Sequence, residues 1–120
     1  MRCDDRHHLA RVVACLADAC QRTNARATIH LDCDRYQDAI DDATKALELG
    51  SISESLLIRG DAYYSSNRCD EALTDLTLYL STTEDPFDRT LGLFKCGVSA
   101  IGLGRLTDAV DFFNKALEVD

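Results

Sequence analysis

His30 and Cys33 are the two side chains whose types and spacing come closest to nucleophilic chemistry. Three residues apart, they share one face of a helix, where an imidazole can take the proton of a thiol. Asp32 and Asp34 lie nearby, but a catalytic pair also requires an orienting group and an oxyanion site to converge on it. We therefore expect His30 to be a satisfied interior histidine and the chain to be non-enzymatic.

Potential metal ligands are present, but not in the patterns that hold metal ions. The run from Asp32 to Gln37 begins like a calcium loop, yet it lacks a third short ligand and the turn glycine. His7 and His8 fit a surface position better than a ligand pair. The cysteines show no pair separated by two residues, the usual zinc spacing; they are Cys3, Cys15, Cys20, Cys33, Cys69 and Cys96. We expect neither a metal nor a cofactor.

A stretch of about thirty residues occurs three times, and this repeat must position the side chains above. The alanines Ala39, Ala72 and Ala109 are separated by 33 and 37 residues. A second set of small residues shows the same two intervals; its members are Ala27, Gly60 and Gly97. Because two markers shift together, the copies are in register, and a period of this length indicates stacked structural repeats.

The apolar spacing within each copy is helical. In the second copy, Leu56, Gly60 and Tyr63 stand at i, i+4 and i+7, which places them on one helix face. No segment alternates with period two for long enough to predict a strand. Each copy therefore predicts a helical hairpin, and the expected breaks lie near Asp34, Asn67 and Gly104.

Local signals mark several helix ends. Asp85 before Pro86 predicts an N-cap followed by the first helical turn. Ser51 and Glu54 resemble a capping box at the start of another helix. Ahead of the repeats, residues 5–22 predict a further amphipathic helix, with an apolar stripe formed by Leu9, Val12, Val13 and Leu16.

The repeat resembles the tetratricopeptide repeat (TPR), in which a bulky residue, Leu-Gly and Tyr precede Ala and a second bulky residue. The second copy matches through Leu56, Gly60 and Tyr63, and the third through Ala109 and Phe113. The resemblance implies an all-α solenoid of helical hairpins, a right-handed superhelix of about seven helices. It divides a single domain into an N-terminal amphipathic helix, 1–19, and three repeats over 20–120, at about 20–52, 53–86 and 90–120.

Composition favours a soluble, cytoplasmic protein. The chain has 13 basic and 21 acidic side chains, a net charge of −8, and residues 61–120 hold 5 and 11 of them. Phosphate binding needs a basic face, so nucleic acid and anionic membranes are not expected partners. No apolar run approaches the length of a membrane helix, and the N-terminus lacks a secretory apolar core. Cys69 and Cys96 are expected to be buried free thiols.

In TPR arrays the first helix of each hairpin lines a concave binding face. The resemblance assigns to this peptide-binding groove Asn24, Thr28, Leu31, Asp32, Leu57, Asp61, Tyr64, Phe94, Val98 and Ile101. An exposed apolar stripe in the third copy needs something to cover it. Two kinds of occupant remain open, a peptide or helix of a partner and a helix supplied by this chain or by a second copy.

The chain also resembles TPR co-chaperones, some of which grip the acidic tails of heat-shock chaperones with lysine, arginine and asparagine. Ala25 stands at the clamp asparagine, next to Asn24, and Ile58 at the clamp arginine, next to Arg59. Asp61 would repel an acidic tail. The expected ligand is therefore an apolar or basic peptide, or a helix.

The predicted function is a protein–protein interaction module, an adaptor or scaffold. The alternatives are a co-chaperone domain that binds a heat-shock chaperone and a self-associating part of a larger complex. The last repeat ends without an obvious cap, at Phe112, Phe113 and Leu117. Either the chain is a piece of a longer protein, or this third repeat packs against another molecule, a second copy included.

Overall fold

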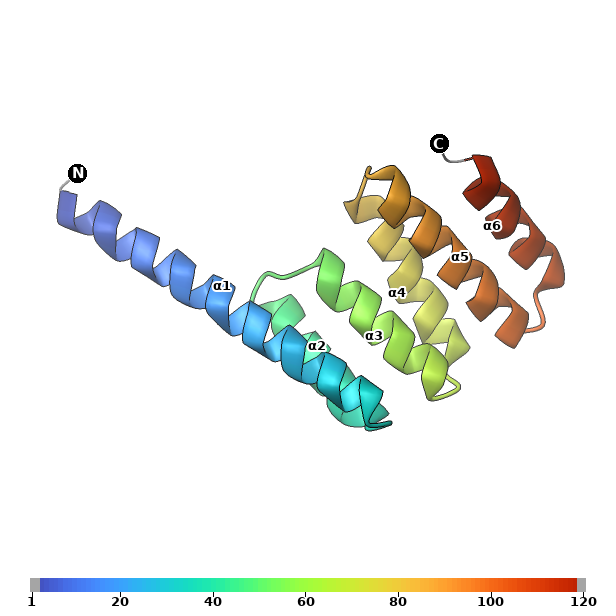
Figure 1. Cartoon of the computed structure of the whole chain (residues 1–120), viewed down its shortest axis with the longest axis horizontal. Coiled ribbons are helices and arrows are strands. Elements are labelled where there is room, and N and C mark those ends of the chain that lie inside the picture. The colour runs from blue at the N-terminus through green and yellow to red at the C-terminus, as the bar shows by residue number, and fades with distance from the viewer. Residues whose placement is uncertain (1–2, 119–120) are drawn as a thin grey trace.

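The computed structural model describes the backbone of residues 3–118 and the side chains of residues 7–118. In this range every regular element is an α-helix, and there are no strands. Its elements are α1 (Cys3–Asp32), α2 (Tyr36–Glu48), α3 (Ser53–Ser65), α4 (Cys69–Thr82), α5 (Pro86–Gly102) and α6 (Leu106–Glu118). They form three hairpins, α1–α2, α3–α4 and α5–α6, which stack side by side along the longest axis of the molecule (Figure 1). The predicted all-α array of helical hairpins is confirmed.

The predicted count of about seven helices is wrong, because six helices account for residues 3–118. The expected N-terminal helix and the first helix of the first repeat are one continuous element, α1. Residues 19–24 contain no glycine or proline that would end a helix. The hydroxyl of Thr23 donates to the Ala19 carbonyl at 2.6 Å, a bond along the helix that needs no break.

The breaks within the hairpins lie where the sequence predicts them. Asp34, Asn67 and Gly104 have φ angles of 61°, 67° and 76°, in the left-handed region that ends many helices. The next residue is an arginine in every case, and its N–H donates to a carbonyl five residues earlier. These bonds are Arg35 to His30 at 2.8 Å, Arg68 to Tyr63 at 2.7 Å and Arg105 to Ala100 at 2.9 Å.

One of the two predicted helix caps is present. The Asp85 carboxylate accepts a hydrogen bond from the Asp88 N–H at 3.1 Å and so caps α5. The capping box predicted to begin at Ser51 is wrong, because Ile52 holds the N-cap position of α3 without a side-chain hydrogen bond. The Ser51 hydroxyl instead accepts a hydrogen bond from the Asn24 amide at 2.9 Å.

The core consists of closely packed contacts between successive helices, here called seams, in which most of the buried residues are small. Gly60 is one example, since a Cβ atom added there would lie 3.0 Å from the Leu76 side chain of α4. Cys69 and Cys96 are buried free thiols in these seams, as predicted. The buried alanines are Ala27, Ala39, Ala43, Ala46, Ala62, Ala72, Ala100 and Ala109. Small side chains let the helix backbones approach closely, which brings the helices of adjacent hairpins into contact.

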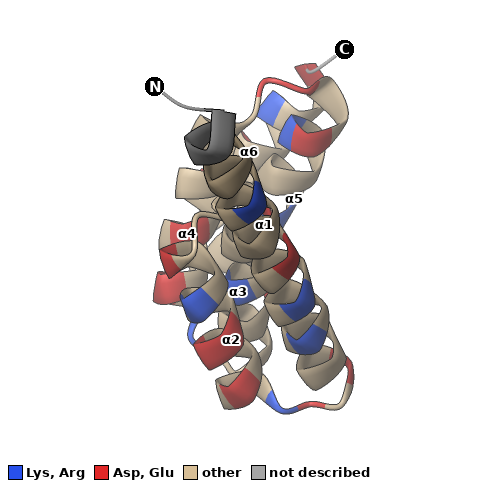
Figure 2. Ribbon diagram, turned by 90° about the vertical axis from the view of Figure 1, so that its left-hand side faces the viewer, with Lys and Arg blue, Asp and Glu red and all other residues tan. Residues whose placement is uncertain are grey.

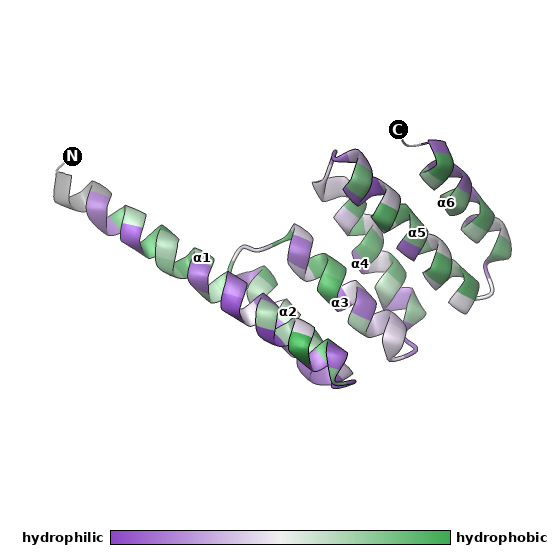
Figure 3. Cartoon of the chain, in the orientation of Figure 1, coloured by the Kyte–Doolittle hydropathy of each residue, from purple (hydrophilic) through white to green (hydrophobic). Residues whose placement is uncertain are grey.

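The N-terminal half of α1 projects from the body of the molecule (Figure 1). Every side chain from residue 7 to residue 18 is exposed. Hydrophobic and hydrophilic residues alternate along this half of the helix (Figure 3). Its apolar stripe is between 41% and 63% exposed and comprises Leu9, Val12, Val13 and Leu16. This part of α1 is therefore an amphipathic helix whose apolar side chains face water.

Candidate functional site

Four of the predicted groove residues meet around one pocket between α3 and α5. The pocket has a volume of about 210 Å³, and Asp61 and Tyr64 of α3 line it together with Phe94 and Val98 of α5. Its remaining lining residues are Leu76, Lys95 and Ser99. Two adjacent repeats thus contribute to a single site, as the first helices of a stacked array are expected to do.

An ion pair crosses this pocket and changes its expected electrostatics. The Lys95 ammonium lies 2.7 Å from a carboxylate oxygen of Asp61, and both side chains are partly exposed. From the sequence alone, Asp61 is expected to be an unpaired negative charge in the groove, and no local pattern points to Lys95 as its partner. Because the two charges offset each other, this side of the pocket is polar but carries no net charge, and it lies beside the aromatic side chains of Tyr64 and Phe94.

Ser99 adds an unpaired hydrogen-bonding group to the same pocket. Its side chain is 1% exposed, and its hydroxyl has no hydrogen-bond partner among the described residues. Buried hydroxyls are paired in most proteins, because an unmade hydrogen bond costs free energy. Ser99 is not predictable from the sequence, since a serine inside a helix carries no local signal of such a position.

Asn24 does not lie in the groove, and its predicted placement there is wrong. The residue is 1% exposed. Its amide nitrogen donates to the Ser51 hydroxyl at 2.9 Å, and its amide oxygen accepts from the Ser55 hydroxyl at 3.1 Å. Asn24 therefore ties α1 to the start of α3, a role that requires its burial.

The other predicted groove residues lie outside the pocket between α3 and α5. Leu31 is partly buried and packs against a core cluster of α2 and α3 residues. Thr28 and Asp32 are exposed on α1, Leu57 is partly buried on α3, and Ile101 is exposed on α5. Their binding role stays a prediction.

Two arginine–aspartate pairs, which the sequence pattern does not predict, join the helices of the first two hairpins. Arg26 binds Asp42 with two bonds of 2.7 and 2.8 Å, and Arg59 binds Asp75 with two bonds of 2.7 and 2.9 Å. The two pairs are 33 residues apart, so the interval that relates the alanines also relates them. The third hairpin carries Cys96 and Phe112 at the equivalent positions, 37 residues further on.

These bonds explain the shifted pKa values in the hairpins. The Arg26 hydrogen bond lowers the pKa of Asp42 below its usual value, against the opposing effect of burial. The Asp75 hydrogen bond raises the pKa of Arg59 in the same way. Arg59 is therefore held by Asp75 of its own hairpin and Thr44 of the first one, Asn24 is held by Ser51 and Ser55, and Ile58 is buried. The side chains nearest to the clamp positions are thus unavailable to an acidic tail.

The residues with possible nucleophilic chemistry do not form an organised centre. His30 is partly buried, and its Nε2 lies 3.6 Å from the Asp42 carboxylate that already binds Arg26. Cys33 is exposed. Burial raises the pKa of the Cys96 thiol to about 11, which keeps this thiol protonated at neutral pH. Among the described residues, no three His, Cys, Asp or Glu side chains come together as a metal site.

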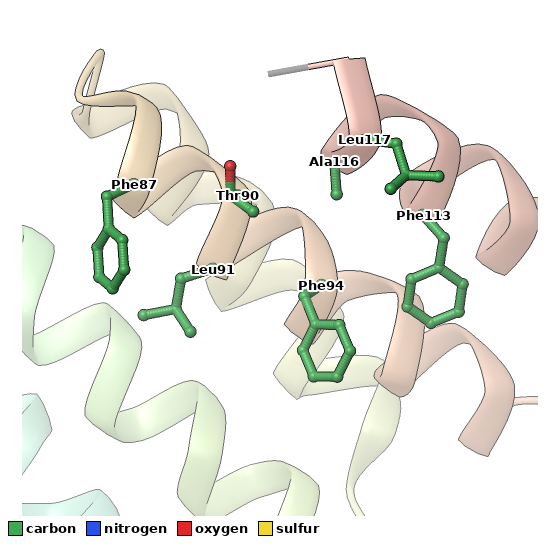
Figure 4. Close-up of a pocket in the computed structure, with 7 residues that line it drawn as sticks. All are labelled: Phe87, Thr90, Leu91, Phe94, Phe113, Ala116 and Leu117. Carbon is green, nitrogen blue, oxygen red and sulfur yellow. The ribbon is translucent and has the colours of Figure 1, made fainter. Parts of the chain in front are cut away.

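A second and more apolar pocket, of about 460 Å³, lies between α5 and α6 (Figure 4). Phe94 borders both pockets, and its ring centroid lies 5.8 Å from that of Phe113. The residues that line the second pocket are Phe87, Thr90, Leu91, Phe94, Phe113, Ala116 and Leu117. Of the apolar residues predicted for the groove in the third repeat, Phe94 borders both pockets, Val98 lines the first, and Ile101 lines neither.

Charged residues do not single out a further site. Lys and Arg are interspersed with Asp and Glu along the helices (Figure 2). Within residues 3–118, no helix combines the length and the apolar character that crossing a membrane requires.

No model of a protein family matches the sequence, and no curated protein matches it. Two crystal structures of MamA are similar to this chain, with TM-scores of 0.74 and 0.75 and 24% sequence identity. The likeness covers 82% of this chain and 57% and 53% of the two MamA chains, so this chain spans about half their length. At this identity the likeness concerns the fold alone, and the fold is a TPR-like array of helical hairpins.

Proposed function

We propose that this chain is a non-enzymatic protein–protein interaction module that binds a segment of a partner in the pocket between α3 and α5. One observation carries the proposal: Asp61, Tyr64, Phe94 and Val98, which the repeat pattern assigns to a concave face, gather around one pocket from two adjacent repeats. The TPR-like fold supports it, because solenoids of this kind offer extended concave surfaces to other molecules.

The chemistry of the pocket favours an apolar anchor on the partner. Tyr64 and Phe94 are exposed aromatic side chains, and such residues often provide most of the binding energy of an interface. The Asp61–Lys95 pair has no net charge, so it favours neither an acidic nor a basic ligand strongly. The proposed ligand is a peptide or helix that inserts one apolar side chain.

The same observations weigh against a carboxylate clamp of the co-chaperone kind. Asn24 is held by two serines, Arg59 by Asp75, and Ile58 is buried. A clamp would have to break these contacts before it could bind an acidic tail.

Selection of peptides on the wild-type chain tests the proposal. Peptides from a random display library should share one apolar residue, and Tyr64→Ala should weaken their binding at least about tenfold because it removes one wall of the pocket. Leu78→Ala is the matched control, since Leu78 is an exposed leucine of α4 outside the pocket. Circular dichroism should show the same helicity for both variants.

Two results would overturn the proposal. One is a selected set of peptides that bind Tyr64→Ala as tightly as the wild type. The other is a set of peptides whose binding is weakened only by substitutions in the α5–α6 pocket, such as Leu117→Asp.

A further inference from the structure

The outer face of the third hairpin is open where the equivalent faces of the earlier hairpins are covered. Leu106 and Leu117 of α6 are 64% and 83% exposed. Their counterparts one repeat earlier, 37 residues back, are Cys69, which is 6% exposed, and Leu80, which is partly buried. The α5–α6 pocket lies on this open face, next to Leu117 (Figure 4).

A helix covers the equivalent face of the second hairpin, and this helix is α5. A Cβ atom at Gly92 would lie 2.8 Å from Leu80, and one at Gly102 would lie 2.6 Å from the Cys69 sulfur. The helix α5 therefore rests along α4 from one end to the other. The repeat thus predicts the occupant of the α5–α6 pocket to be a helix as well.

Apart from the open face of α6 itself, the described part of the chain contains one helical segment with an apolar stripe that nothing covers, the projecting half of α1. Its residues Leu9, Val13 and Leu16 are spaced at i, i+4 and i+7. The face that α5 presents to α4 has the same spacing, in Gly92, Cys96 and Ser99, which are all buried. The side chains on α1 are larger, and the pocket of about 460 Å³ has room for them.

Geometry requires that the two surfaces meet between molecules. The projecting half of α1 and the hairpin α5–α6 lie at opposite ends of the longest axis, which extends over 58 Å (Figure 1). Charge favours the same encounter, because residues 1–22 carry 4 basic and 3 acidic side chains whereas residues 61–120 carry 5 and 11.

We propose that copies of this chain associate head to tail, with Leu9, Val13 and Leu16 of one copy packed into the α5–α6 pocket of the next. The two surfaces differ, so the contact is heterologous and leaves a free head and a free tail on every assembly. A helix of this length covers less than the roughly 800 Å² per partner of a typical stable interface. Association is therefore weak and depends on concentration. It involves a different pocket from the proposed ligand site between α3 and α5.

Sedimentation velocity of the full chain over a wide concentration range tests the inference. The wild type should grow beyond dimers as its concentration rises. Val13→Asp places a charge in the apolar stripe of α1, the head, and Leu117→Asp places one in the α5–α6 pocket, the tail. Each variant alone should therefore remain a monomer. Both positions are exposed, and the two variants should therefore keep the helicity of the wild type.

Matched controls separate the two surfaces from general effects of an added aspartate. Ala14→Asp places the same charge on the opposite face of the same helix half. Leu78→Asp makes the same change at an exposed leucine of α4. Both controls should associate as the wild type does.

An equimolar mixture of Val13→Asp and Leu117→Asp gives the sharpest result. The first variant retains an intact pocket and the second an intact head, so together they should form a dimer and nothing larger. Each of three results would overturn the inference: a wild type that is monomeric throughout, a mixture without dimers, or association by either variant alone. Persistent association of Leu117→Asp would indicate pairing between two α1 helices, and that of Val13→Asp would indicate another occupant of the pocket. None of these outcomes bears on the proposed peptide binding, which is tested separately with Tyr64→Ala.

Discussion

The two arginine–aspartate pairs share their geometry but differ in their exposure to water. Arg59 is 20% exposed beside a buried Asp75, whereas Arg26 is 59% exposed beside Asp42. Water competes with the Arg26 pair and screens its charges, while the Arg59 pair is better shielded. The second hairpin therefore depends more on its ion pair than the first does.

We expect Asp75→Ala to lower the free energy of unfolding by about 2 kcal/mol, because it leaves the Arg59 guanidinium without its carboxylate. Asp42→Ala should cost less, since water can solvate Arg26. Urea denaturation followed by circular dichroism measures both losses. Asp41→Ala, at an exposed aspartate of α2, is the control. An equal loss for Asp75→Ala and Asp42→Ala would contradict this difference.

Acid provides a second measurement of the Asp42 pair. Because the pKa of Asp42 is lowered in the folded chain, the pair contributes stability above the usual pKa of the carboxyl, 3.8, and loses it as the pH falls through the depressed value. The wild type should lose stability over this acidic range, and Asp42→Ala should lose less. The difference between the two chains should therefore shrink as the pH falls below about 4.

Seams without bulky side chains decide how closely the helices pack. At Gly60 the atoms nearest to an added Cβ would belong to the buried Leu76 side chain, at 3.0 Å, which is closer than side chains normally pack. Where a neighbour cannot yield, the helices must separate and the apolar contacts along the seam weaken.

Gly60→Val should therefore destabilise the chain by about 2 kcal/mol, the size of a typical overpacking cost. Ser65→Val, at the exposed end of α3, controls for the effect of a β-branched residue on the helix itself. Thermal unfolding measures both. The explanation fails if the two variants lose stability to the same extent.

The elements were more predictable from the sequence than their partners were. Asp34, Asn67 and Gly104 could be placed because residues that tolerate a left-handed backbone recur at the repeat interval. The position of Asn24 could not be predicted, since its burial depends on the hydroxyls of Ser51 and Ser55, which lie 27 and 31 positions further along the chain. The ion pair of Asp61 with Lys95 likewise joins two repeats. A local pattern predicts a helix end, but it does not show which polar side chains a fold will bring together.

Across the whole molecule the three hairpins are unequal. The second lies between two others, whereas α6 of the third has an open outer face and no arginine–aspartate pair. In a stack where each repeat contacts only its neighbours, stability follows the contacts that each repeat makes. The third hairpin is therefore expected to open before the second.

Amide hydrogen exchange should show this order directly. At low concentration the amides of α6 should exchange faster than those of α4, because opening α6 exposes fewer buried contacts. Raising the protein concentration should slow exchange in α6 if head-to-tail contacts form. Faster exchange in α4 than in α6 at low concentration would contradict the proposed order.

The unbroken length of α1 also has a mechanical consequence. A helix of 30 residues is about 45 Å long, and its projecting part acts as a lever fixed at the first hairpin. A bend of about 10° near the hairpin would move the far end of the helix by roughly 4 Å, and long helices commonly curve. The direction of this lever sets the rotation from one copy to the next. Its curvature therefore decides whether a head-to-tail series closes into a ring or continues as an open filament.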